Sequence, residues 1–403
     1  MLTTIPALAI ADAYGAATAL LGDTRDIVIE RAEAQPPIWV TSRGWLDYLT
    51  GLDDAELGHA DTEGIDTWFL GDSRCPQSLA DLARRVGALT AAIPSLSSTP
   101  PALEAAHMNV RKRGQVATIL SLLGEAFPES SEIVDVGAGH GHLTMHAAEA
   151  LSVPAVGLER NRERVATARA LGVGRSVRFL DADVLAENNP LQALSTDPAR
   201  LLMALHGCGD LADAVVRAAV ATRSRVLLLP CCPQKIRGSE RSSLMSNLHF
   251  PRAVLGLANV LARTTGIEGD LRQALATKES RIALRYLLAA RGCSIPPGEE
   301  MRGVNRRKAN AGFAVFSEAV CRARHFPPPS TDEITTASRQ AHAHYQAQRR
   351  FSLPRSMLGR VLEIYLSLDR AAFLQSHGYA VRLVQMFPAA YSPRNLGILG
   401  MAR

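Results

Sequence analysis

The stretch IVDVGAGHGHL at residues 133–143 decides the fold of this chain. Its first four residues are typical of a buried strand, and the glycines after them indicate a turn into a helix. Glycine permits the positive φ angles and the close approach of a ligand to the backbone that such a turn needs. Main-chain N–H groups at the helix start would then face the ligand. The stretch therefore predicts a binding site between a strand and a helix.

Outward from this turn, short apolar segments alternate with segments of helical periodicity. Strands separated by helices imply right-handed crossovers and a parallel sheet. A helix over Arg355–His377 precedes two closing strands, which form a hairpin with one antiparallel strand. We therefore predict an α/β fold with a mostly parallel, seven-stranded sheet. Its strands are expected at Ile133–Val136, Ala155–Leu158, Val177–Leu180, Leu201–Leu205, Val226–Pro230, Ala380–Phe387 and Leu396–Met401.

The chain is too long for one ordinary hydrophobic core, and a Ser- and Pro-rich stretch near residue 100 suggests a boundary between two domains. Residues 1–100 are expected to form a mainly helical cap domain, with helices over Trp45–Leu57 and Ser78–Ile93 and a Ser/Pro linker at its end. Residues 101–403 would form the catalytic domain, which opens with a helix over Ala102–Leu123. A helical insertion at about 234–350 would separate its fifth strand from the closing hairpin.

The spacing of the glycines indicates which ligand the turn binds. In the dinucleotide motif G-x-G-x-x-G the third glycine would fall one residue after Gly141, where His142 stands. The observed G-x-G-x-G spacing is that of S-adenosylmethionine (SAM) enzymes, so we predict a class I SAM-dependent methyltransferase fold, Rossmann-like, with SAM as cofactor. The alternative is an ordinary strand-to-helix turn with incidental acids nearby.

Carboxylates after the next two strands strengthen the SAM prediction. Glu159 ends the second strand, where a carboxylate accepts the ribose hydroxyls, and Asp183 follows the third, where such enzymes bind the adenine amine. Asp135 would fix the loop or reach the methionine amino group. The predicted cofactor site comprises Asp135, Gly137, Ala138, Gly139, Gly141, Glu159, Arg160, Asp183, Val184, Leu205 and His206.

Two unusual clusters follow the fourth and fifth strands: LHGCGD at residues 205–210 and PCCP at residues 230–233. Methyl transfer is an in-line displacement, so the protein must position an acceptor and, where necessary, remove its proton. His206 is a candidate base or a cofactor contact, and Cys231 and Cys232 are candidate nucleophiles. Alternatively, the cysteines are small buried residues or parts of a tight turn, or Cys208, Cys231 and Cys232 hold a metal together with His206. No local ligand spacing supports a metal, so none is predicted.

Charge distribution suggests the partner. The net charge is +5, and arginines concentrate between Lys235 and Arg324, whereas residues 1–100 are rich in acids. A basic segment of this kind predicts contact with RNA through the insertion. The alternatives are a solvated helical face and a docking surface for the acidic N-terminal part.

The cysteines indicate the cellular compartment of the protein, and the apolar runs indicate whether it spans a membrane. The six cysteines have no zinc-ribbon spacing, which favours free thiols in a reducing cytoplasm. No apolar run approaches the roughly 18 residues of a membrane span. Ile5–Leu21 lacks preceding Lys or Arg and contains Asp12, so we expect it to form a helix rather than a signal peptide.

Several motifs together resemble a known family. They are MNVRKRGQV at 108–116, the Gly-rich loop, LHGCGDL at 205–211, LPCC at 229–232, the block 366–371 and SPRN at 392–395. The chain resembles the methyltransferase-like proteins named for an rRNA-adenine-dimethylase domain. It is more distantly similar to tRNA 2′-O-methyltransferases with H-x-C-G and C-C motifs.

The resemblance implies RNA methylation, and the chain departs from the family pattern at a few positions. Gly114-Gln115 replace a His-Glu pair, Pro233-Gln234 follow the cysteine pair, and His140 stands where Lys is common. Two other hypotheses stay open. One is the same fold with a protein or small-molecule acceptor, and the other is a SAM-fold binding protein without turnover.

Overall fold

The structure is a computed structural model, which describes residues 5–96, 110–259, 268–389 and 391–403. It divides into two compact units, which we call the sheet unit and the helical unit. The sheet unit comprises Met1–Arg25, Gly87–Ala262 and Leu358–Arg403, and the helical unit comprises Asp26–Val86 and Arg263–Met357. This grouping differs from the sequence-based boundary at residue 100, because most of the N-terminal segment groups with part of the insertion.

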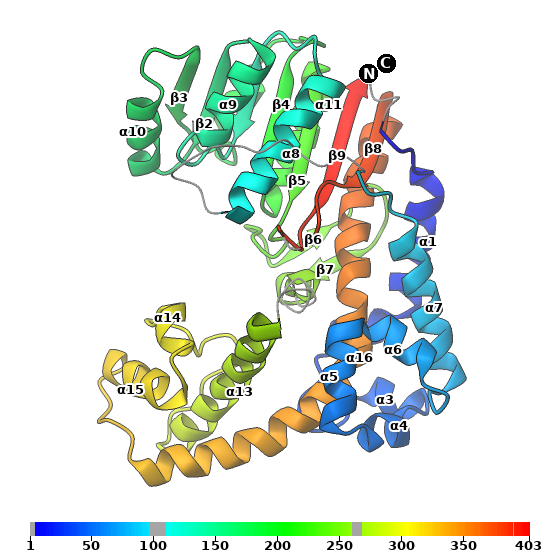
Figure 1. Ribbon diagram of the computed structural model, residues 1–403, viewed down its shortest axis with the longest axis vertical. Helices are drawn as coiled ribbons and strands as arrows, with labels where there is room; N and C mark the ends of the chain where they lie inside the picture. The colour runs from blue at the N-terminus through cyan, green and yellow to red at the C-terminus, as the bar shows by residue number, and fades with distance from the viewer. Residues whose placement is uncertain (1–4, 97–109, 260–267, 390) are drawn as a thin grey trace. The chain divides into compact units, whose positions relative to one another are not determined.

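A seven-stranded sheet forms the centre of the sheet unit, with the strand order β3-β2-β1-β4-β5-β9-β8 (Figure 1). β9 pairs antiparallel with both β5 and β8, whereas the other neighbours run parallel. The mostly parallel sheet with a closing hairpin is therefore confirmed. Its strands are β1 (Ile133–Val136), β2 (Ala155–Glu159), β3 (Val177–Asp181), β4 (Leu201–Gly207), β5 (Arg225–Pro230), β8 (Tyr379–Gln385) and β9 (Leu396–Ala402).

Helices between the strands cover the sheet and bury its apolar residues. Leu123 and Phe127 at the end of one helix pack in a core with Ile133, Leu201 and Leu227 of three neighbouring strands. The helix predicted from Ala102 is described from residue 110 onward, and its first part lies outside the described residues. The helices of this unit include α1 (Ile10–Asp23), α8 (Val110–Ala126), α9 (His142–Leu151), α10 (Arg162–Leu171), α11 (Asp210–Thr222) and α12 (Arg252–Leu255), with 3₁₀ turns η2 (Pro190–Ala193) and η3 (Gly256–Asn259).

The start of the insertion contains a small hairpin instead of a helix. β6 (Glu240–Ser242) pairs antiparallel with β7 (His249–Pro251), with Arg241 opposite Phe250. The insertion is mostly helical, as predicted, but this short segment is not. Strands of three residues are too short to show the alternation that identifies a strand in a sequence.

The helical unit is built from helices alone among its described secondary-structure elements. Leu284 and Leu288 of α13 pack with Phe316 and Val320 of α15 in its core. The N-terminal segment and the later part of the insertion are helical as predicted, although Trp45–Leu57 forms parts of two helices. The helices are α2 (Arg25–Ile29), α3 (Ile38–Ser42), α4 (Leu46–Gly51), α5 (Asp54–Glu63), α6 (Ile65–Gly71), α7 (Gln77–Ala91), α13 (Glu268–Ala290), α14 (Arg306–Ala309) and α15 (Phe313–Ala323), of which α2 and α7 each cross a unit boundary.

One long helix, α16 (Thr331–Ser376), contributes residues to both units. The sequence analysis separated a helix over Arg355–His377 from the helical insertion that ends at about residue 350, whereas the structure joins them in one helix. The structure keeps Pro354 inside the helix, where flanking residues such as Tyr345 and Leu362 are buried. Packing on both sides of the proline outweighs the lost hydrogen bond. In the described part of the chain, no helix is long and apolar enough to cross a membrane.

Candidate functional site

The Gly-rich turn lies between β1 and α9, as the sequence predicted. Gly137, Gly139 and Gly141 all have positive φ angles, of 81°, 61° and 78°. A Cβ atom at Gly141 would also collide with the ring of Phe179. Only glycine fits such a position, because an L-residue adds steric cost in the left-handed region and has no room for its side chain here. Gly137 N–H and Ala138 N–H both donate to the carbonyl of Leu158, 2.8 and 3.1 Å away, which fixes the turn on β2.

Glu159 ends β2 and its carboxylate lies at the Gly-rich turn. Its Oε2 accepts a hydrogen bond from Gly139 N–H at 3.1 Å, and its Oε1 accepts one from Asn161 N–H at 2.9 Å. The side chain is buried, whereas the neighbouring Arg160 is exposed. The structure therefore brings the predicted ribose-binding carboxylate to the predicted loop.

Asp135 is buried at the start of the turn. Thr144 of α9 donates its hydroxyl to Asp135 Oδ2 at 2.6 Å. Burial raises the pKa of Asp135 to about 6, the hydrogen bond from Thr144 opposes this, and the negative charge of Glu159 adds to it. This carboxyl group links β1 to the first turn of α9, in agreement with its predicted role in fixing the loop.

The third carboxylate, Asp183, is engaged by a residue that the sequence analysis did not single out. Arg237 donates from Nη2 to Asp183 Oδ2 at 2.9 Å, and Leu185 N–H donates to Oδ1 at 2.9 Å. Val184 beside it is buried. Arg237 comes from the loop after β5, and no local pattern in the sequence connects it to the end of β3.

The end of β4 is irregular at His206. The pairing with β5 shifts between Leu205 and Gly207, and His206 has a φ angle of 64°. A bulge of this kind changes the direction in which a side chain points, and a left-handed angle costs a non-glycine residue about 1–2 kcal/mol. Such strain concentrates at functional sites. Desolvation by the surrounding protein atoms lowers the pKa of His206, although the residue keeps an exposed surface. The Cys232 thiolate opposes this lowering, and the charges of Arg394 and Lys112 add to it.

The cysteines of the two clusters meet at this edge of the sheet. The Sγ atoms of Cys208 and Cys231 are 2.8 Å apart, and those of Cys208, Cys231 and Cys232 all lie within 4.8 Å of one another. Hydrogen bonds from Cys208 and Cys231 hold the pKa of Cys232 well below its ordinary value, and burial opposes this. The Arg394 guanidinium contributes to the same lowering. The two catalytic candidates from the PCCP cluster therefore share one sulfur cluster with Cys208.

Arg394 reaches the cluster from the closing hairpin. Its Nη1 donates to the Sγ of Cys232 at 3.0 Å. Asn395 next to it fixes the turn by donating from Nδ2 to the carbonyl of Phe387 at 2.8 Å. The same segment requires glycine at position 114, which leaves room for the ring of Tyr391: a Cβ there would approach the ring to 2.7 Å.

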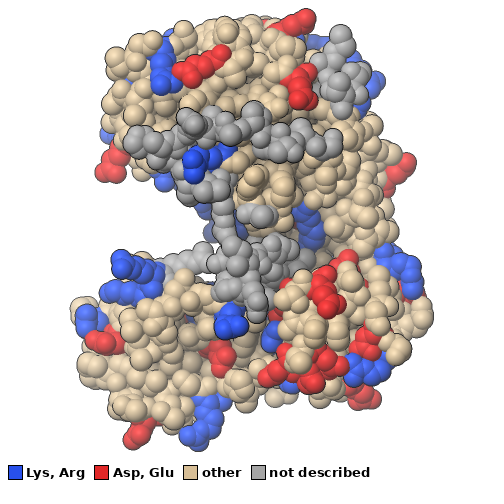
Figure 2. Space-filling view, in the orientation of Figure 1, with Lys and Arg blue, Asp and Glu red and all other residues tan. Residues whose placement is uncertain are grey.

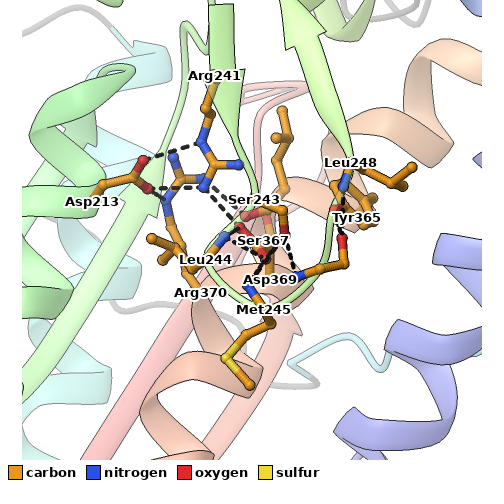
Figure 3. A network of polar contacts seen from close by, with 12 residues as sticks. Asp213, Arg241, Ser243, Leu244, Met245, Leu248, Tyr365, Ser367, Asp369 and Arg370 are labelled. Atoms are coloured by element: carbon orange, nitrogen blue, oxygen red, sulfur yellow. Dashed lines mark hydrogen bonds and ion pairs between the residues drawn. The ribbon is translucent and has the colours of Figure 1, made fainter.

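A buried polar network holds the loop after β5 against the C-terminal part of α16 (Figure 3). Arg241 of β6 donates to Asp369 Oδ2 at 2.9 Å and to Asp213 Oδ1 at 3.0 Å. Asp213 also pairs with Arg370, and Asp369 accepts the main-chain N–H of Leu244. Burial raises the pKa of Asp213, but the guanidinium groups of Arg370 and Arg241 lower it overall. The two arginines and two aspartates balance each other in charge.

Comparison with known proteins identifies the central part of the sheet unit. Residues 111–239 match the model of a family described as "Methyltransferase domain". This range contains the Gly-rich turn, Glu159, Asp183 and both cysteine-bearing turns. With the seven-stranded sheet order, the match shows that the chain contains a SAM-dependent methyltransferase domain of class I fold.

Solved structures are similar only in part. The YcgJ protein of Bacillus subtilis is 17% identical over 29% of this chain and 50% of its own, with a TM-score of 0.24. A sugar N-methyltransferase from a Streptoalloteichus species is 18% identical over 34% and 59%, with a TM-score of 0.23. Magnesium protoporphyrin IX methyltransferase from Synechocystis, with bound S-adenosylhomocysteine, is 16% identical over 43% and 69%, with a TM-score of 0.23. The chain thus spans 50% and 59% of the length of the first two structures.

Proposed function

We propose that the protein transfers a methyl group from SAM to RNA, with the acceptor bound at the ends of β4 and β5. In open α/β sheets a ligand lies outside the carboxyl ends of the strands, and here that edge carries His206 and the sulfur cluster. The Gly-rich turn, Asp135, Glu159 and Asp183 would bind SAM, which supplies the methyl group. The transfer needs the acceptor held in line with that group.

The observation that carries the RNA proposal is the charge around His206. Arg394 of the closing hairpin and Lys112 of α8 both act electrostatically on His206, whose backbone is strained. Two cations suit a phosphate-bearing acceptor, because phosphate contacts dominate the affinity of proteins for nucleic acids. The net charge of +5 supports the same partner. His206, turned out of the β4 pairing, would contact the acceptor.

The insertion contributes less to RNA contact than its composition predicts. Arg281 pairs with Glu300 at 2.8 Å, and Arg291 pairs with Glu333 at 2.7 Å. Within the helical unit, Arg285 of the basic segment also pairs with Glu33 of the acidic N-terminal segment at 4.0 Å, so the two segments do contact each other there. Exposed cations remain on α14, at Arg307 and Lys308, where Figure 2 shows basic side chains. We propose that these contact the RNA backbone.

The pairing of these arginines also favours a second candidate function. Arginines that are neutralised by acidic partners hold helices together and do not form a continuous basic surface. A protein or small-molecule acceptor would then be methylated at the same edge of the sheet. This candidate keeps the same SAM site and differs only in the acceptor.

Labelled SAM distinguishes the candidates. The full-length protein is incubated with methyl-labelled SAM and, in separate reactions, total RNA, a protein extract and a small-molecule extract. We expect ribonuclease-sensitive label in the RNA reaction. Label confined to another fraction would refute the RNA proposal, and tight SAM binding without transfer in any fraction would support a binding protein without turnover.

His206→Ala tests the acceptor site in the same assay. We expect at least a tenfold loss of transfer, with SAM affinity within about twofold of the wild type by calorimetry. His59→Ala, in an exposed position of the helical unit, is the matched control and should keep full activity. Full activity of the His206 variant would place the acceptor elsewhere.

A further inference from the structure

The three cysteines at the sheet edge come from two turns that the sheet brings together. Gly207 and Pro230 are partners in the register of β4 and β5, so Cys208 and the Cys231-Cys232 pair follow neighbouring strand ends. The N–H of Cys231 donates to the carbonyl of Gly207 at 3.3 Å, which ties one turn to the other. The backbone thus fixes where the sulfurs meet.

Glycine makes this approach close. Gly209 has a φ angle of 53°, and a Cβ atom there would collide with the carbonyl of Lys235. Lys235 N–H in turn donates to the carbonyl of Cys232 at 3.1 Å, which closes a turn at the cysteine pair. The two cysteine-bearing turns are therefore packed backbone to backbone, and their side chains have little freedom to separate.

The spacing of the sulfurs suits a metal ion. A Zn–S distance of about 2.3 Å in a tetrahedral site places sulfurs about 3.8 Å apart. The three Sγ atoms here all lie within 4.8 Å of one another, so small side-chain rotations would bring each to a common centre. Three thiols packed as ordinary buried residues would gain nothing from meeting at one point, and a single nucleophile would need only one of them.

We propose that Cys208, Cys231 and Cys232 bind one thiophilic metal ion, with Zn²⁺ as the best match to three thiolates. The structure supplies three protein ligands, and a fourth position is then open to water or to a substrate atom, as in catalytic zinc sites. The guanidinium of Arg394, 3.0 Å from the Sγ of Cys232, offsets the net negative charge that three thiolates leave on a divalent ion. Each cysteine is partly buried, so the site keeps access to solvent.

No local pattern in the sequence marks this site. Structural zinc sites show pairs of ligands at short spacing, whereas Cys208 and Cys231 are 23 residues apart and belong to different strand ends. From this spacing we predicted no metal. The metal site proposed here rests instead on where the sheet places the three sulfurs.

Metal binding is measured on the full-length protein, independently of methyl transfer. The protein is purified with reductant, treated with a chelator and titrated with Co²⁺ and then with Zn²⁺. We expect one ion per chain, a sulfur-to-cobalt charge-transfer absorption, and its loss when Zn²⁺ displaces Co²⁺. Cys208→Ser, Cys231→Ser and Cys232→Ser should each weaken binding at least tenfold, whereas Cys293→Ser, a partly buried cysteine of the helical unit, should leave it unchanged.

Thiol protection in the wild-type protein tests the site without relying on the folding of any variant. Zn²⁺ should slow alkylation of Cys208, Cys231 and Cys232 but not of Cys75, as read by mass spectrometry of the labelled peptides. Binding below one ion per chain overturns the proposal, and so does protection that Zn²⁺ does not change. A Cys208–Cys231 disulfide that persists in the protein purified with reductant also overturns it.

Discussion

The cofactor half of the methyltransferase domain and its acceptor side are held together in different ways. We use these names for the turns after β1 to β3 and for the ends of β4 and β5 with the segments that pack on them. In the cofactor half, hydrogen bonds join residues 9 and 20 positions apart, from Thr144 to Asp135 and from Gly139 to Glu159. On the acceptor side, Arg241 binds Asp369 and Arg394 binds Cys232 across 128 and 162 positions. Although Arg237 reaches Asp183 across 54 positions, local chain geometry builds most of the first region, and tertiary packing builds the second.

The largest expected effect is that of removing Asp369, a residue of the acceptor side. Asp369→Ala would leave Arg241 and Arg370, both buried, with only Asp213 as a counter-charge. An uncompensated buried charge costs about 3–5 kcal/mol, so we expect a loss of that size in the free energy of unfolding, measured by urea denaturation. Asp47→Ala, in an exposed position, should change it by less than about 0.5 kcal/mol. A small effect at Asp369 would mean that the acceptor side does not depend on this network.

The cofactor half should respond to pH through Asp135. Its pKa of about 6 lies above the usual value for an aspartate, because the fold favours the protonated form. The ionised Asp135 therefore lowers the free energy of unfolding. This loss is absent below about pH 4, grows as the pH rises, and is complete above about pH 6, where it reaches about 3 kcal/mol. We expect Asp135→Asn to remove this component.

Urea denaturation of the wild type and of Asp135→Asn between pH 4 and pH 7 measures this difference. The advantage of the variant should grow across the window and then level off. Glu163→Gln, an exposed position on α10, is the control and should follow the wild type. Parallel curves for Asp135→Asn and the wild type would contradict the burial of a carboxyl group at the turn.

The smallest expected effect, on affinity and not on folding, is that of Glu159→Ala. The variant loses a carboxylate that accepts main-chain N–H groups at the turn and that is predicted to accept the ribose hydroxyls. Charged hydrogen bonds contribute about 1.5–3 kcal/mol, which corresponds to SAM binding about ten- to a hundredfold weaker by calorimetry. Glu163→Ala should bind SAM normally. Unchanged affinity in a folded Glu159 variant would move the cofactor away from β2.

Much of the fold could be predicted from the sequence because its signals are local. The strands were found within a few residues, since each is a short apolar run between helical segments. The hairpin β6–β7 and the continuity of α16 through Pro354 could not be found in this way. The hairpin is too short to show a period, and Pro354 interrupts a helix that packing then continues.

The candidate site also has one part that the sequence predicts and another that it does not. The sequence placed Gly139, Gly141 and Glu159 together correctly, because a strand, a turn and the next strand fix their positions. It did not predict that Arg237 would pair with Asp183, because that arginine belongs to a loop whose path depends on packing. The function of these residues in binding SAM stays a prediction that the Glu159 variant tests.

The sequence by itself determined a SAM-dependent methyltransferase domain, because glycine spacing and strand periodicity are properties of neighbouring residues. Only the tertiary structure decided what lies at the acceptor edge: the left-handed His206, the meeting of Cys208 with Cys231 and Cys232, and the arrival of Arg394. These contacts depend on the register of β4 with β5 and on the course of the closing hairpin. Side chains that meet across such distances in the chain leave no periodic signal in the sequence.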